Sequence, residues 1–158
     1  MRLVQTTLLT LGLMTCYTLA ASSSVSKEWL VSPTEAKEFG GEVGFNELPA
    51  LRLRGAVPMI DIIKPEQADG LKVKIPFPII VQFKAQADAP IDPTTFKVMY
   101  GTFKFDITGR VTKLVKVTKD GFSIEAAEIP PGRHRLILHV QDEKMRVAER
   151  ELRLEVVE

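Results

Sequence analysis

The chain contains two histidines, His134 and His139, the side chains best suited to acid–base chemistry near neutral pH. They are five residues apart in a segment that alternates apolar and polar residues, as a β-strand does. Successive side chains of a strand point to opposite faces of its sheet, so this odd spacing separates the two imidazoles. They cannot form one site by themselves.

His134 follows the turn sequence Pro130-Pro131-Gly132 at the start of that strand. β-Sandwiches often place a polar ring at such a position, where its tip ties the turn to the strand, as in the tyrosine corner. We therefore predict a structural role for His134 rather than a role in ligand binding or proton transfer. His139 is expected on the outer face of the sheet.

Nucleophilic catalysis needs a serine, cysteine or threonine with a base and a group that orients the base. Ser123 is the only serine after Ser32, and no Gly-x-Ser-x-Gly sequence surrounds it. Carboxylates of the last segment alternate with arginines, which indicates a solvated face rather than a glycosidase pair. We predict no catalytic residues and no enzymatic activity.

Metal binding is not indicated either. Calcium loops place Asp and Asn at alternating positions with a glycine, whereas Asp61, Asp69, Asp88 and Asp92 lack that spacing. A copper site would need clustered histidines and methionines, which are far apart here. The sequence therefore predicts no metal site and no cofactor.

Glycan binding relies on aromatic side chains that present flat faces, and the single tryptophan, Trp29, precedes the predicted sandwich. Together with Leu30 and Val31 it could instead dock on an open sheet edge. Four phenylalanines stand at predicted inward positions and are expected in the core. They are Phe83, Phe96, Phe103 and Phe105.

A basic series with a spacing of three is formed by Arg110, Lys113, Lys116 and Lys119. On a strand this spacing alternates between faces, so a continuous binding stripe would require a bulge. The alternative is protection of a sheet edge by lysine against pairing with another chain. Arg110, Lys113, Lys116 and Trp29 are thus the candidate binding residues.

Residues 1–21 have the features of an export signal: Arg2, then an apolar run without further charge that ends in small residues. The most apolar part of this run, Leu8 to Ala21, has only 14 residues, fewer than the roughly 20 that span a bilayer, so we expect cleavage and no remaining membrane span. Cys16 follows bulky residues that fit a lipoprotein signal poorly, so lipid anchoring is not expected. The predicted location is periplasmic or secreted.

The whole chain has 21 Lys and Arg against 20 Asp and Glu, and Arg2 is the one charge in the signal. The mature protein is therefore formally neutral. Binding to a polyanion needs a basic excess or a basic face, so nucleic acid is not an expected partner.

Residues 22–56 are predicted to form an N-terminal extension. Ser32, Pro33 and Glu35 have the spacing of a capping box with proline at the first helical position, which predicts a short helix from Pro33 to about Phe39.

Residues 57–158 contain short alternating segments separated by turn residues, the pattern of a β-sandwich. An Asp120-Gly121 pair between two of them is a strong hairpin signal. No segment with helical periodicity interrupts the series, so an all-β, immunoglobulin-like antiparallel sandwich of about seven to eight strands is predicted. The expected strands are 59–63, 79–86, 96–100, 103–107, 111–118, 122–126, 135–141 and 146–157.

The sequences IDPTTFKV at 91–98 and IPPGRHRL at 129–136 resemble those of bacterial immunoglobulin-like domains of exported proteins. The resemblance covers about 58–158 and implies the fold more than a function, because such domains act as spacers, adhesive modules and accessory domains. With one such domain in the chain, a spacer role is not expected.

The leading hypothesis is an exported, non-catalytic module that binds an envelope or extracellular protein as an accessory or scaffold component. A β-sandwich that binds a glycan or another small ligand is the alternative, and an enzyme is third.

Overall fold

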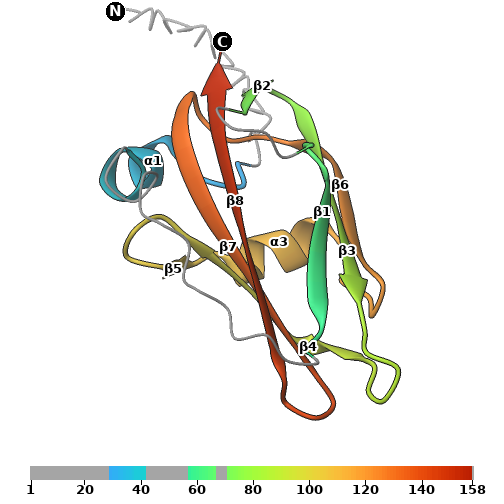
Figure 1. Ribbon diagram of the computed structural model, residues 1–158. Helices are drawn as coiled ribbons and strands as arrows, with labels where there is room; N and C mark the ends of the chain where they lie inside the picture. The colour runs from blue at the N-terminus through green and yellow to red at the C-terminus, as the bar shows by residue number, and fades with distance from the viewer. Residues whose placement is uncertain (1–28, 42–56, 67–70, 158) are drawn as a thin grey trace, which may run out of the picture.

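The computed structural model describes residues 29–41, 57–66 and 71–157, which form two β-sheets packed face to face (Figure 1). This confirms the predicted all-β sandwich. One sheet has the order β1-β3-β6: β1 (Met59–Lys64), β3 (Phe77–Lys84) and β6 (Gly121–Ala127). The other has the order β2-β8-β7-β4-β5: β2 (Lys72–Lys74), β8 (Val147–Val157), β7 (Gly132–Asp142), β4 (Ile91–Tyr100) and β5 (Phe105–Asp106).

The strand order is that of an immunoglobulin sandwich, in which strands A, B and E form one sheet and C, F and G the other. β1, β3 and β6 correspond to the first set, and β4, β7 and β8 to the second. These strands pair antiparallel. β2, which was not predicted, pairs with the end of β8 in parallel.

Alternating burial along the strands builds the core between the sheets. In β3, for example, Phe77, Ile79, Val81 and Phe83 are buried, while the residues between them are exposed or partly exposed. Phe83 and Phe96 pack with Phe122 at centroid distances of 5.1–6.4 Å, so these two phenylalanines are core residues as predicted.

The segment Trp29–Gly41, here called the strap, lies against the sandwich. Its helix α1 (Pro33–Phe39) has the predicted bounds and capping box, since the Ser32 hydroxyl accepts from the Glu35 amide and Glu35 accepts from the Ser32 amide. Leu30 and Val31 are buried in the core, and the Leu30 amide donates to the carbonyl of Glu128 (2.9 Å) just after β6. The strap therefore docks beside the edge strand β6.

The predicted strand over 111–118 is wrong, because Thr108–Leu114 forms a helix, α3. Val111 is the buried residue of this helix, and it is flanked by the N-cap Ile107, which is buried, and by the C-cap Val115, which is partly buried. α3 lies between the two sheets near β4 (Figure 1). The expected absence of a helix within the strand series is therefore also wrong. Because the segment before Asp120-Gly121 is not a strand, this turn does not join a two-stranded hairpin. It closes only an isolated bridge between Thr118 and Gly121.

The predicted strand 103–107 with inward phenylalanines is wrong as well. β5 has only two residues, and the chain between it and β4 turns through left-handed backbone at Gly101 (φ 71°) and Lys104 (φ 53°). Phe103 is 78% exposed and Phe105 40% exposed, whereas Ile107 is buried as expected.

The predicted signal at 1–21, Cys16 and most of the extension 22–56 lie outside the described residues. Within the described ranges, no helix has the length and hydropathy needed to traverse a bilayer.

Candidate binding surface

His134 is buried in the core, as its predicted structural role requires. Its Nδ1 lies 2.7 Å from the hydroxyl of Tyr100, and its Nε2 lies 2.7 Å from the carbonyl oxygen of Pro130. A carbonyl oxygen only accepts hydrogen bonds, so Nε2 carries the proton and Nδ1 accepts from the tyrosine. The imidazole thereby ties the turn before β7 to the end of β4.

Burial keeps both rings neutral. It lowers the pKa of His134, because the charged imidazolium would lose its hydration, and it raises the pKa of the Tyr100 hydroxyl for the same reason. His139 lies on the opposite face of β7, as predicted, so the two histidines form no common site.

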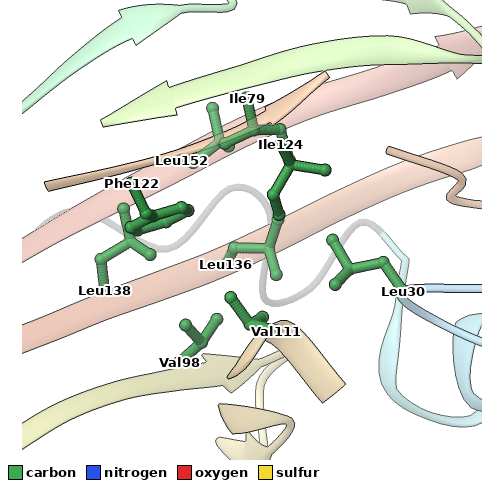
Figure 2. A pocket seen from close by; sticks show the side chains of 9 residues that line it. All are labelled: Leu30, Ile79, Val98, Val111, Phe122, Ile124, Leu136, Leu138 and Leu152. Atoms are coloured by element: carbon green, nitrogen blue, oxygen red, sulfur yellow. The ribbon is translucent and has the colours of Figure 1, made fainter. Parts of the chain in front are cut away.

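A small cavity lies between the sheets (Figure 2). Its volume is about 20 Å³, and its walls are entirely aliphatic or aromatic. A cavity of this size could hold one water, but water needs two or more polar partners and none lines this space. We interpret the cavity as a packing gap. It is lined by Leu30, Ile79, Val98, Val111, Phe122, Ile124, Leu136, Leu138 and Leu152.

Arg110, a candidate binding residue, anchors the strap. Both terminal guanidinium nitrogens of Arg110 donate to the carboxylate of Glu35, which also completes the capping box of α1. The hydrogen bonds from Arg110 hold the pKa of Glu35 at about 2, below its ordinary 4.5. Arg110 therefore links α3 to α1 and is not available as part of a basic stripe.

Replacing Glu35 with glutamine is expected to lower the free energy of unfolding by about 1 to 2 kcal/mol at neutral pH, because Gln can cap the helix but cannot pair with Arg110. Since the pKa of Glu35 is lowered in the folded state, the ion pair stabilises the fold fully above pH 4.5. The stabilisation is lost as the pH falls through about 2. Urea unfolding of both proteins across this range measures the difference.

Glu38→Gln is the matched control, since Glu38 lies on the same helix and is exposed. A difference between Glu35→Gln and wild type that stays constant from neutral to acidic pH would contradict the ion-pair explanation.

The other candidate residues do not join Arg110. Lys113 lies on α3, while Lys116 and Lys119 follow the helix, and all three are exposed without an ion-pair partner among the described residues. Trp29 is partly buried at the beginning of the strap. The structure therefore does not assemble the predicted candidates into one site.

Three phenylalanines that the sequence did not identify as binding residues form a group at the surface, here called the aromatic patch: Phe103 and Phe105 are exposed, and Phe39 is partly buried. Phe39 at the end of α1 stacks on Phe105, with ring centroids 5.3 Å apart and planes 5° apart. Phe103 meets Phe39 edge to face at 6.3 Å and 77°. Because Phe103 is 78% exposed, most of its ring faces solvent.

The patch depends on a close approach between the strap and the β4–β5 turn. A Cβ at Gly101 would lie 2.2 Å from the carbonyl oxygen of Phe39, and Gly101 has a left-handed φ of 71°. Glycine alone fits both conditions. The Gly101 amide donates to the Arg135 carbonyl (2.9 Å), which fixes this turn on β7.

Charged side chains of both signs accompany the patch. Lys37 and Glu38 precede Phe39 on α1, and Lys104 stands between Phe103 and Phe105. All three are exposed, and no described residue forms an ion pair with them. Their charges are available to a partner.

The opposite end of the sandwich carries a closed ionic network. Arg146 binds both Asp88 (2.6 Å) and Asp142 (2.7 Å), and Lys144 binds Asp88 (2.8 Å). Hydrogen bonds from Arg146 and Lys144 lower the pKa of Asp88. The network joins the β3–β4 and β7–β8 turns, and its charges satisfy one another.

Across residues 29–41, 57–66 and 71–157, no group of three or more His, Cys, Asp or Glu side chains is arranged to hold a metal ion.

Comparison with known proteins gives little further information. No protein-family model matches the sequence, and no curated protein does. A solved structure with partial similarity is the crystal structure of CopC from Methylosinus trichosporium OB3b, at 10% identity and a TM-score of 0.37. The match covers 55% of this chain and 82% of that chain. Similarity at this level says nothing about what the protein binds.

Proposed function

We propose that the protein is an exported, non-catalytic immunoglobulin-like module that associates with another protein of the cell envelope or extracellular space through the aromatic patch. The observation that carries this proposal is the exposure of Phe103 (78%) and Phe105 (40%) beside Phe39. Exposed aromatic rings are enriched at protein interfaces, where a few of them supply most of the binding energy. The export signal predicted at 1–21 supports the location.

The chemistry of the patch favours a protein over a glycan. Sugars are recognised by stacking combined with hydrogen bonds to their hydroxyl groups, and phenylalanine offers no hydrogen-bonding group. Charged residues adjoin the three phenylalanines in the chain: Lys37 and Glu38 before Phe39, Lys104 between Phe103 and Phe105, and Asp106 after Phe105. Apolar side chains with opposite charges beside them, as on a protein surface, fit this arrangement.

Phe103→Ser is expected to abolish capture of the partner while leaving the fold intact. The side chain is mostly solvated, so the free energy of unfolding should change by no more than about 0.5 kcal/mol. Loss of a central aromatic anchor typically weakens binding by 2 kcal/mol or more. Affinity purification from envelope extract, with the recovered protein then purified and titrated against both forms, measures the effect.

Met145→Ser is the matched control, because Met145 is 79% exposed but lies at the β7–β8 turn near the ionic network. Equal binding by wild type and Phe103→Ser would refute the proposal. Binding of wild-type protein to glycans on an array, lost in Phe103→Ser, would assign the patch to sugars instead.

A further inference from the structure

We propose that the aromatic patch binds a second copy of this chain in a two-fold symmetric dimer. The inference rests on the proposed function: it keeps the patch as a protein-binding surface and names as the partner a second copy of the same exported chain. Two properties of the patch, its shape and its charges, make it complementary to itself.

The shape provides a projecting ring and a platform on the same surface. Phe39 and Phe105 form the flat, nearly parallel pair, and Phe103 stands close to perpendicular to Phe39. A two-fold interface brings the same surface of both subunits together, so each residue makes its contact twice. Phe103 of each copy can then pack on the stacked pair of the other, where Phe105 retains 40% exposure.

The charges beside the patch match this pairing. Lys104 lies on the turn that carries Phe103, whereas Glu38 lies on the helix that carries Phe39. When Phe103 of one copy packs on the stacked pair of the other, Lys104 comes toward the helix α1 of that copy, which carries Glu38, and the symmetry repeats the approach. Neither side chain forms an ion pair among the described residues, so neither contact requires an existing pair to break.

The strap and the turn are also held firmly enough to present one surface. Glu35 and Arg110 fix the first turn of α1, and Gly101 fixes the contact between Phe39 and the β4–β5 turn. A surface ordered before association loses less conformational entropy when it binds.

The test is sedimentation equilibrium of the purified protein from micromolar to millimolar concentration. We expect a monomer–dimer equilibrium in wild type and a dissociation constant raised at least 100-fold in Phe103→Ser, because both contacts are lost. Lys104→Glu and Glu38→Lys should each raise it about tenfold, since each sets like charges against one another twice. The double variant Lys104→Glu/Glu38→Lys should restore it to within a few-fold of wild type.

Lys64→Glu, a charge reversal on the exposed end of β1 in the other sheet, is the control and should leave the equilibrium unchanged. A monomer at every concentration overturns the inference, as does a dimer that survives Phe103→Ser or is not restored by the double variant. If the protein is a monomer but captures a different protein through Phe103, the dimer is refuted and the proposed function stands. If Phe103→Ser changes neither dimerisation nor capture, the proposed function fails too.

Discussion

Replacing Leu30 with alanine is expected to lower the free energy of unfolding by about 2 to 4 kcal/mol, although Leu30 precedes every strand of the sandwich. Leu30 is 2% exposed and lines the cavity between the sheets (Figure 2). The substitution removes buried apolar surface and joins the lost volume to the existing gap of about 20 Å³. Urea unfolding monitored by the fluorescence of Trp29 and by circular dichroism measures the loss.

Lys37→Ala tests whether the strap in general or the buried leucine is responsible, because Lys37 lies on the same segment and is exposed. It should change the stability by less than about 0.5 kcal/mol. If Leu30→Ala were equally mild, the strap would be a surface attachment rather than part of the core.

His134→Ala is expected to lower the free energy of unfolding by about 2 to 4 kcal/mol. It leaves the Tyr100 hydroxyl and the Pro130 carbonyl without their partner, and it opens a void where a ring that is 1% exposed had packed. Tyr100→Phe removes only one of the two hydrogen bonds, so it should cost about 1 to 2 kcal/mol.

The stability of the wild type should also fall below about pH 6.5. Burial lowers the pKa of His134 in the folded protein, so the unfolded chain takes up a proton first and unfolding becomes more favourable as the pH falls. His139, whose pKa is also lowered by burial, contributes in the same direction. His134→Ala should therefore show a weaker pH dependence than wild type, and an unchanged dependence would exclude His134 as its source.

The parts of the fold that sequence predicted well are those with a local physical signal. The capping box of Ser32 and Glu35 gave the bounds of α1, and the alternation of apolar and polar residues in most of β8 and in parts of β7 indicated these two strands. His134 was assigned correctly because its position after Pro-Pro-Gly is itself a local feature. In each case the residues that determine the structure are neighbours in the chain.

α3 was missed because its residues fit two periods. Val111, Val115 and Val117 would share one face of a strand, and their β-branched side chains favour a strand. Ile107, Val111 and Val115 also recur at a helical spacing, so the same residues fit a helix as well. Packing decides between the two periods: as a helix, the segment places Val111 in the core between the sheets.

The aromatic patch was missed for a different reason. Phenylalanine is usually buried, and the alternation of Phe103, Phe105 and Ile107 supported an inward strand. The residue that stacks on Phe105 is Phe39, which lies far away in sequence. No pattern in the residues next to Phe105 predicts this contact. The left-handed Lys104 could not be anticipated either, because lysine seldom adopts that conformation.

The position of β8 has a consequence for a chain as it leaves the ribosome. β8 lies between β7, which it pairs along nearly its whole length, and β2, which precedes it by more than half of the sandwich sequence (Figure 1). The five-stranded sheet cannot close until residues 147–157 have been synthesised. Pairings between segments so distant in sequence slow folding. The edges of the unfinished sheet therefore stay accessible to chaperones until this strand has emerged.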